Sequence, residues 1–364
     1  GTHLCVPLVS RQIFLACGAD KSAPYGCTRS FVVTAERASH FIASVRLPVL
    51  QTLFLFLPSK PHLLYNKANP FERRCSCLRF LHLSDLHLGK RVCEFSMLDD
   101  QRYILEEILS LLDTTPVDGV LLAGDLYDKP VPPAEAVRLL DWFLTQLAAR
   151  KLPVFAISGN HDSADRIAFG SALLEPSRVY VSPVFSGAPQ PIPLQDAHGT
   201  VDVYLLPFLK PAMVRHVWPD EPMESYNDAL ACVLRHCELD PAHRSVLVAH
   251  QFVAGAACCE SEEVSVGGVD SVDASLFDGF DYVALGHLHS PQKVGRDAVR
   301  YCGTPLKYSF SEAGQHKSAT FVELGTKGDV TITTAPLTPK HDLREVRGSY
   351  MELTDRRHHD GTAV

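Results

Sequence analysis

Five short segments of the chain carry residue types that bind metal ions, and each follows a short apolar run. They are Asp85-Leu86-His87, Gly124-Asp125, Gly159-Asn160-His161-Asp162, His250 and Gly286-His287-Leu288-His289. Carboxylates, an amide oxygen and imidazoles suit Mn²⁺, Fe or Zn²⁺, and no cysteine is among them. A single DxH or HxH is more often an accident than a site, but five such segments at strand ends are hard to produce by accident. The sequence therefore predicts a metal centre.

Local geometry indicates how these segments could converge. Residues i and i+2 of an extended segment point to the same side, so Asp85 with His87 can present two ligands to one site. The same spacing holds for His287 and His289. Glycine permits sharp turns and close backbone approach. It directly precedes three of the candidate ligands, namely Asp125, Asn160 and His287.

Apolar patterns predict the elements that must position the first three segments. Buried strands are expected at 79–83, 119–123 and 154–157, and helices at 97–112 and from Pro132-Pro133 to 147. Two successive strand–helix–strand units favour a parallel α/β sheet with helices on its faces. Active sites of open α/β sheets form beyond the carboxyl ends of the strands, where these segments lie.

Weaker patterns continue toward the end of the chain. Strands are expected at 201–206, 245–249 and 282–285, with a helix at 225–236. Two further runs, 320–324 and 330–334, flank Gly325-Thr326-Lys327-Gly328 and predict a β-hairpin. The last two candidate segments, around His250 and His287, thus also follow expected strands.

Charge is distributed unevenly along the 364 residues, whose net charge is −8. Residues 1–77 hold nine Lys/Arg and three Asp/Glu, whereas the remaining residues hold 25 and 39. An acidic body is not typical of a simple nucleic-acid binder. It suits an enzyme that attracts phosphate through bound cations, because a metal inverts the local charge.

Composition also indicates in which cellular compartment the protein is expected. No run approaches the roughly 18 consecutive apolar residues of a membrane helix, and no secretory signal is evident. The eleven cysteines form no CxxC pair, which favours free thiols in a reducing cytoplasm. Residues 1–77 show no sustained period and are expected to be a disordered or spurious extension, with a targeting segment as the alternative.

The order DxH…GD…GNHD…H…GHxH resembles the signature of the calcineurin-like metallophosphoesterases. FLHLSDLHLGK, AGDLYDKPVPP, ISGNHDSADRIAFG and GTPLKYSFSE look like the SbcD nuclease family, over about 78–353. GTPLKYSFSE discriminates best, since phosphoesterases of small substrates rarely carry it. The resemblance implies an α/β (α+β) fold, a two-sheet β-sandwich flanked by helices. It implies a nuclease domain at 78–338 and the start of a truncated capping domain at 339–364, with 1–77 outside the family.

The resemblance also implies two divalent metal ions, Mn²⁺ first, with Mg²⁺, Fe or Zn²⁺ as alternatives. The ligands implied for the first metal are Asp85, His87, Asp125 and His289. Those implied for the second are Asp125, Asn160, His250 and His287. Asp125 would bridge the two ions, which together activate a water and stabilise the reacting phosphodiester.

Two residues beside the ligands are the implied catalytic pair. His161 would orient the phosphate or protonate the leaving 3′ oxygen, and Asp162 would hold its imidazole. The alternative for His161 is a structural neighbour without a catalytic role. Four basic residues near the motifs are candidates for DNA-phosphate contacts or, equally, solvated surface: Lys90, Arg91, Arg166 and Lys307.

The function implied is a metal-dependent DNA endonuclease and 3′–5′ exonuclease in DNA repair and hairpin processing. Its expected partners are DNA, an SbcC-like SMC-type ATPase and a second copy in a homodimer. The ATPase-docking segment is expected to follow the capping-domain start and to be missing here. Two alternatives remain: a phosphodiesterase or phosphatase on a small or protein substrate, and a non-catalytic scaffold. All seven implied ligands are present, which disfavours the scaffold.

Overall fold

The computed structural model describes residues 13–14, 32–33, 77–259, 262 and 270–344. The chain divides into two units, Gly1–Pro70 and Phe71–Val364. In the first unit, β1 (Ile13–Phe14) pairs antiparallel with β2 (Val32–Val33). The remaining residues up to 76 lie outside the described part, as do 345–364. The expectations for the extension and for the docking segment therefore stay predictions, as does most of the capping-domain start.

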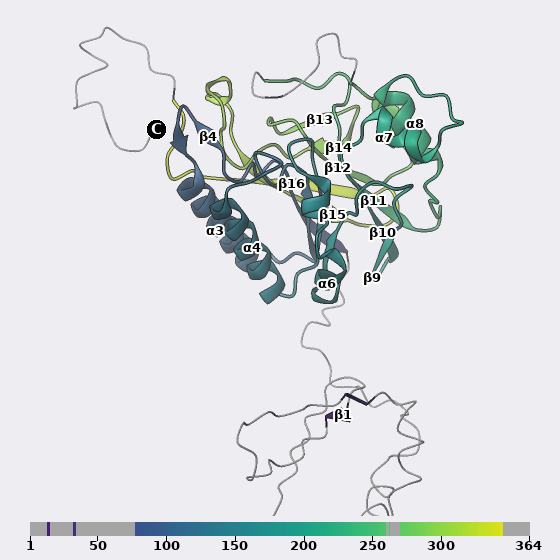
Figure 1. The fold of residues 1–364 in the computed structure, drawn as a ribbon, viewed down its shortest axis with the longest axis horizontal. Coiled ribbons are helices and arrows are strands. Elements are labelled where there is room, and N and C mark those ends of the chain that lie inside the picture. The colour runs from purple at the N-terminus through teal and green to yellow at the C-terminus, as the bar shows by residue number, and fades with distance from the viewer. Residues whose placement is uncertain (1–12, 15–31, 34–76, 260–261, 263–269, 345–364) are drawn as a thin grey trace, which may run out of the picture. The chain divides into compact units, whose positions relative to one another are not determined.

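The second unit is a sandwich of two six-stranded sheets (Figure 1). The first sheet contains, in order, β16 (Val330–Pro336), β15 (Ser318–Leu324), β3 (Leu78–Leu83), β6 (Gly119–Ala123), β7 (Val154–Ile157) and β8 (Val179–Val181). The second contains, in order, β13 (Gln292–Val294), β14 (Arg296–Tyr301), β12 (Tyr282–Gly286), β11 (Arg244–His250), β10 (Gly199–Leu206) and β9 (Ile192–Asp196). The parallel sheet predicted from the first three strands is confirmed, since β3, β6 and β7 pair in parallel. Local patterns did not predict the second sheet, because a strand's periodicity does not say which sheet it joins.

Four neighbouring strands in each sheet run parallel, and the remaining strand pairs in both sheets are antiparallel. In the first sheet β3, β6, β7 and β8 are parallel. In the second, β10, β11, β12 and β14 are parallel. The loops that leave the carboxyl ends of these strands are therefore gathered at one edge of each sheet.

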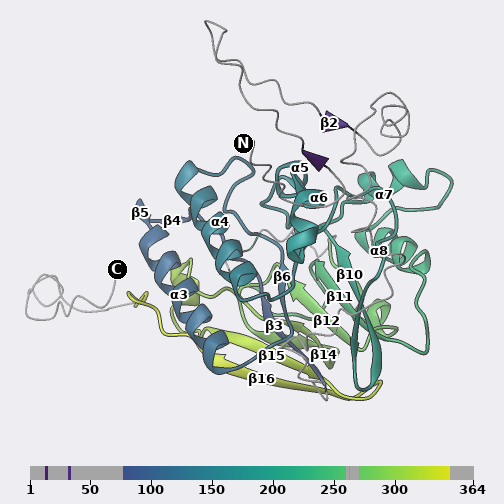
Figure 2. The same ribbon diagram turned by 90° about the horizontal axis from the view of Figure 1, so that it is seen from below.

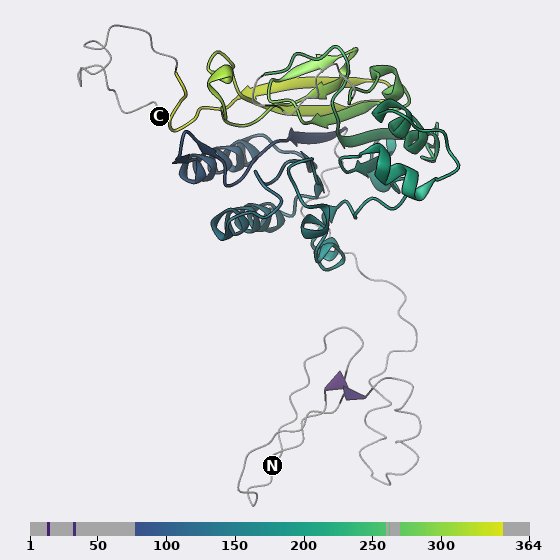
Figure 3. The same ribbon diagram turned by 45° about the horizontal axis from the view of Figure 1, so that its top comes forward.

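Helices cover both outer faces of the sandwich. The pair α3 (Leu98–Thr114) and α4 (Ala134–Ala149) packs on the first sheet, and α7 (Pro211–Val217) and α8 (Tyr226–Arg235) pack on the second. Figure 2 shows the two pairs on opposite sides, and Figure 3 shows α3 and α4 as a separate layer beside the strands. A third core lies between the sheets and includes Phe80, Phe155 and Tyr282. Burial on both faces explains the continuous apolar runs of the central strands.

Most element boundaries follow local chemistry that the sequence already displays. Helix α4 begins directly after Pro133, which fits a first turn. Ser225 and Asp228 form a reciprocal capping box at the start of α8. The expected hairpin between β15 and β16 is confirmed, with Gly325 N–H donating to the carbonyl of Asp329 over 2.9 Å.

The pattern analysis missed several helices and strands, most of them short or at a sheet edge. They are β4 (Arg91–Val92), β5 (Phe95–Ser96), α5 (Ala164–Ile167), α6 (Ser171–Leu174), α7, β8, β9, β13 and β14. Strand β9 lies at an edge and contains Pro193, which weakens any strand signal. In the described part of the chain, no helix combines the length and apolarity needed to cross a membrane.

Candidate metal centre

The five segments meet at the carboxyl ends of central strands from both sheets. Backbone hydrogen bonds hold the first two together: Asp85 N–H donates to Gly124 O over 3.0 Å and His87 N–H to Asp125 O over 2.9 Å. The N–H of His287, from the second sheet, donates to the Asp85 carboxylate over 3.0 Å. The predicted convergence of the segments is therefore present and spans both sheets.

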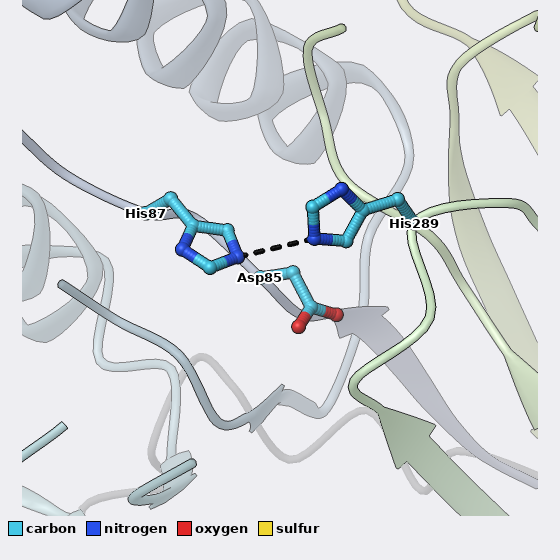
Figure 4. Close-up of side chains that lie close together, drawn as sticks. All are labelled: Asp85, His87 and His289. Atoms are coloured by element: carbon cyan, nitrogen blue, oxygen red, sulfur yellow. Dashed lines mark hydrogen bonds between the residues drawn. The ribbon is translucent and has the colours of Figure 1, made fainter. Parts of the chain in front are cut away.

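One cluster consists of Asp85, His87 and His289 (Figure 4). Their ligand atoms all lie within 4.8 Å of one another, and the three residues are buried. The Nε2 atoms of His87 and His289 are 3.2 Å apart. Two imidazole nitrogens from opposite sheets are thus directed at the same small space.

A second cluster lies on the other side of Asp125. The Asn160 Oδ1 atom is 2.9 Å from His250 Nε2 and 2.9 Å from His287 Nδ1. The Asp125 Oδ2 atom is 3.4 Å from His250 Nε2 and 3.8 Å from His87 Nε2. One carboxylate therefore lies between an imidazole of each cluster.

The backbone at four of these residues differs from the extended geometry expected from the i, i+2 spacing. The φ angles are 52° at Asp85, 43° at His87, 48° at Asp125 and 103° at His287. Positive φ is uncommon for residues other than glycine and costs on the order of 1–3 kcal/mol each. His287 and His289 lie in different clusters of the one centre, as the family resemblance implies, and their roles as ligands stay predictions.

All three positions that precede candidate ligands require glycine, because neighbouring loops lie too close for a side chain. A Cβ atom at Gly124, where φ is 88°, would overlap the ring of His250. A Cβ atom at Gly159 would overlap the Asp125 carboxylate. A Cβ atom at Gly286 would overlap the carbonyl oxygen of Ala123 and the ring of His250. The predicted close backbone approach is confirmed at all three positions.

Hydrogen bonds on the outer nitrogen fix two of the imidazole rings. The Nδ1 atom of His250 lies 2.7 Å from the carbonyl oxygen of Ala123. The Nδ1 atom of His289 lies 2.9 Å from the carboxylate of Glu312. Since each outer partner accepts a hydrogen bond from Nδ1–H, the Nε2 atom of each ring is the one directed as a ligand into the cluster.

Burial and mutual proximity shift the protonation of the cluster. Burial lowers the pKa of His87 well below its ordinary value and that of His287 to about 3, so both rings are neutral. Burial also raises the pKa of Asp85 to about 6. At Asp125 burial acts in the same direction, but the charge and hydrogen bond of His250 hold its pKa well below the usual range. Neutral imidazoles at His87 and His287 fit divalent metal ions, which need deprotonated ligands. At His250 burial lowers the pKa, but the charge and hydrogen bond of Asp125 outweigh it and raise the pKa to about 9, so metal binding must release this proton.

His161 and Asp162 are placed differently from each other. The N–H of His161 donates to Asp125 Oδ1 over 2.8 Å, and its ring centroid is 4.8 Å from that of His87. Its Nδ1 atom lies 3.1 Å from the carbonyl oxygen of Asp128.

The carboxylate of Asp162 instead accepts three backbone N–H bonds of 2.9–3.0 Å, from Leu126, Tyr127 and Gly159. Among the described residues, no contact joins it to the imidazole of His161. The geometry favours a role in holding the two ligand loops together over the expected role of orienting the ring.

Comparison with known proteins now adds to this geometry. The family model described as calcineurin-like phosphoesterase matches residues 78–291. A curated relative, the SbcD component of the nuclease SbcCD from Staphylococcus epidermidis, is 32% identical over 284 residues, which cover 77% of this chain and 75% of that protein. The chain belongs to the calcineurin-like phosphoesterase family. It is a metal-dependent phosphoesterase, and the family's two-sheet fold, expected from the resemblance, is confirmed.

Two solved structures are also similar to this phosphoesterase. One is a dimetal phosphatase from Danio rerio, 14% identical with a TM-score of 0.42, covering 71% of this chain and 96% of that one. The other is the protein TT1561 of Thermus thermophilus, 12% identical with a TM-score of 0.37, covering 71% and 99%.

The phosphoesterase positions its first ligand loop with two residues that motif analysis missed. Gln101, from α3, donates to the carbonyl of His87 over 2.8 Å and accepts from Gly89 N–H over 3.0 Å. The hydroxyl of Tyr308 donates to the carbonyl of Leu86 over 2.6 Å. A polar residue within the buried apolar stripe of a helix is the signal that could have revealed Gln101.

The four basic residues near the phosphoesterase motifs have unequal surroundings. Lys90 Nζ is 2.8 Å from Asp128 Oδ1, and the side chain of Arg91 is 55% exposed. Arg166 lies on the short helix α5, where no residue is buried. Lys307 Nζ contacts Asp342 at 2.9 Å and the carbonyl of Ala313 at 2.8 Å. Phosphate contact stays a prediction for all four, and Lys307 is already neutralised by a carboxylate.

Proposed function

We propose that this phosphoesterase is a metal-dependent nuclease that hydrolyses DNA phosphodiesters as an endonuclease and 3′–5′ exonuclease. The observation that carries the proposal is the convergence of all seven candidate ligands at one buried edge of the sandwich. Sequence similarity to a nuclease subunit over 77% of the chain supports the same conclusion. The proposed context is DNA repair and hairpin processing in the cytoplasm.

The proposed ligand sets follow the two clusters. Asp85, His87 and His289 hold one ion, Asn160, His250 and His287 hold the other, and Asp125 contributes to both. Oxygen and nitrogen donors without thiolate suit Mn²⁺. When bound, the two ions lower the pKa of a water and offset the charge of the phosphodiester. The protein's own contribution is to hold imidazoles from two sheets at hydrogen-bonding distances before metal arrives.

His161 is the proposed catalytic residue. Its N–H bond to Asp125 and the contact of its Nδ1 atom with the Asp128 carbonyl fix the ring beside the first cluster. If Nδ1 donates to that carbonyl, Nε2 is left to contact the phosphate or give a proton to the leaving 3′ oxygen. Asp162 supports this arrangement indirectly, through the loop that it holds.

The proposed partners are an SbcC-like ATPase and a second copy of the chain. The ATPase is proposed because the matched relative is a subunit of the SbcCD assembly. The homodimer is supported by two apolar side chains on and beside α6, Phe169 and Leu173, which are 86% and 84% exposed. Sedimentation of a Leu173→Glu variant beside the native chain tests the dimer, which the charge should dissociate.

The experiment for the main proposal compares two substrates. The chain is incubated with Mn²⁺ and either a DNA hairpin or a nitrophenyl phosphodiester, with Asp125→Ala as the inactive control. We expect hairpin cleavage that requires Mn²⁺ and disappears in the variant. Hydrolysis of the small diester without any DNA cleavage would contradict a nuclease and support the small-substrate alternative.

A further inference from the structure

The two clusters differ in what stands behind their histidines. The outer nitrogen of His250 faces the neutral carbonyl oxygen of Ala123 at 2.7 Å. The outer nitrogen of His289 faces a carboxylate, Glu312 Oε1, at 2.9 Å. A carboxylate partner raises the basicity of a ligating imidazole and fixes its tautomer more strongly than a carbonyl does. The ring of His289, in the first position, is therefore supported by a charged partner, and the ring of His250, in the second, by a neutral one.

Glu312 is held firmly in this position. The residue is fully buried, and its Oε2 atom is 2.7 Å from Lys317 Nζ. The same ammonium group donates to the carbonyl of His289 over 2.9 Å and to Thr304 Oγ1 over 2.7 Å. Lys317 thus holds the backbone of His289 and the carboxylate that contacts its ring.

The ring direction that results is visible in the cluster. With Nδ1 bonded to Glu312, the Nε2 atom of His289 lies 3.2 Å from His87 Nε2, inside the first cluster. Rotation of the ring away from this direction would break the bond and leave a buried carboxylate with one fewer partner, which is costly. The Glu312–Lys317 pair therefore fixes the direction of a proposed metal ligand.

We propose that Glu312 is a positioning residue that makes the first metal position, at Asp85, His87 and His289, the tighter of the two. This inference rests on the proposed two-metal function. It deepens that function by giving the two ions an order of binding, the first position filling before the second. It also gives a role to the SFSE end of the GTPLKYSFSE segment, which supplies Glu312.

The test measures each position separately in the full chain. His250→Ala leaves the first position, and His87→Ala leaves the second. Glu312→Ala is added to each background, and Mn²⁺ dissociation constants are measured from the electron paramagnetic resonance signal of free Mn²⁺. Loss of a hydrogen-bond partner behind a ligand typically weakens metal binding by about 10–100-fold. We expect that loss at the first position and a clearly smaller change at the second, because Glu312 acts through the ring of His289, which belongs to the first position.

Two further variants separate positioning from folding. Glu312→Gln keeps an acceptor oxygen for the ring but removes the charge, so an intermediate loss of Mn²⁺ affinity at the first position is expected. If Glu312→Ala does not fold, Glu312→Gln is the variant that tests the inference. Asp342→Asn is the matched control, because Asp342 pairs with Lys307 in a neighbouring loop. It should leave both dissociation constants unchanged, and metal-free melting temperatures report the folding of every variant.

If Glu312→Ala weakened Mn²⁺ binding equally at both positions, the effect would be a general structural one and the inference would be overturned. Unchanged Mn²⁺ binding at the first position would overturn it as well. Failure of the proposed function gives a different result. In that case the native chain binds fewer than two Mn²⁺ ions or cleaves no DNA. If the native chain bound two ions and cleaved DNA normally but Glu312→Ala had no effect, only the positioning role of Glu312 would be contradicted.

Discussion

Strand β11 has a buried ionisable residue at each end, and the two ends are built differently. At its start, Arg244 pairs with Asp196 through contacts of 2.5 and 2.9 Å, and the two side chains are 3% and 1% exposed. Arg244 also donates to the carbonyls of Leu324 and Gly325, across in the other sheet. At its end, His250 lies among Asp125, Asn160 and His287 of the centre.

The difference separates a structural site from a functional one. At the amino end, opposite charges meet and the pair joins the two sheets. At the carboxyl end, groups of the same kind also face one another, such as the Nε2 atoms of His87 and His289, and four residues adopt positive φ. Backbone strain persists only where the surrounding fold enforces it, and it is typical of functional sites. Substitutions at the two ends should therefore have opposite signatures.

The largest effect is expected from His161→Ala at the carboxyl end. The variant should bind two Mn²⁺ ions yet cleave DNA about 10²–10⁴-fold more slowly, because a positioned proton donor is lost. Metal titration and single-turnover cleavage measure the two properties. Asp162→Ala is the comparison, and it should instead lose metal affinity, because three backbone N–H groups lose their acceptor. Normal cleavage by His161→Ala would make the residue a structural neighbour.

At the amino end, Asp196→Ala should destabilise the fold and leave the chemistry intact. Removal of one partner from a buried ion pair costs about 3–5 kcal/mol, since Arg244 is left uncompensated. Urea unfolding of the metal-free protein measures the loss. Cleavage per folded molecule should match that of the native chain. A slower cleavage rate at full folding would mean that the two ends are coupled.

The free energy of unfolding at acid pH should depend on the same Arg244–Asp196 ion pair. Burial alone would raise the pKa of Asp196, but hydrogen bonds from Arg244 and from backbone N–H groups lower it below its usual range. A lowered pKa contributes stability above the unfolded value of about 3.9, and this contribution is lost as the pH falls through the folded value. Unfolding of the native chain between about pH 5 and 2 should therefore show a steeper loss than that of Asp196→Asn. If stability fell equally steeply with pH in the native chain and in Asp196→Asn, the proposed contribution of the Arg244–Asp196 pair would be contradicted.

The smallest effect is expected from Lys90→Ala, beside the centre. Its ammonium group is partly exposed and pairs with Asp128, so its loss should weaken DNA binding by a few-fold. The plot of log DNA affinity against log salt concentration should become less steep by the amount expected for one phosphate contact. Lys293→Ala, which removes an exposed ion pair with Asp297, is the control and should change neither quantity. An unchanged slope for Lys90→Ala would remove the residue from the DNA-binding surface.

The sequence predicts most of the site at the carboxyl end of strand β11 and little of the ion pair at its amino end. Residue types and their positions after apolar runs were enough to place Asp85, Asp125 and His250 in one site. They did not show that two sheets contribute, because pairing between strands is not encoded in the period of either one. They also did not reveal Arg244 with Asp196, or Glu312 behind His289. Those contacts join residues far apart in the chain whose types are ordinary on a surface.

The central claim is that two ions bind on either side of Asp125. The direct measurement is anomalous scattering at the manganese edge from crystals soaked in Mn²⁺, for the native chain and for Asp125→Ala. The account predicts two peaks in the native protein, about 4 Å apart, one beside His87 and His289 and one beside Asn160 and His250. The second peak should vanish and the first weaken in the variant. A single native peak, or two full peaks in Asp125→Ala, would contradict the account.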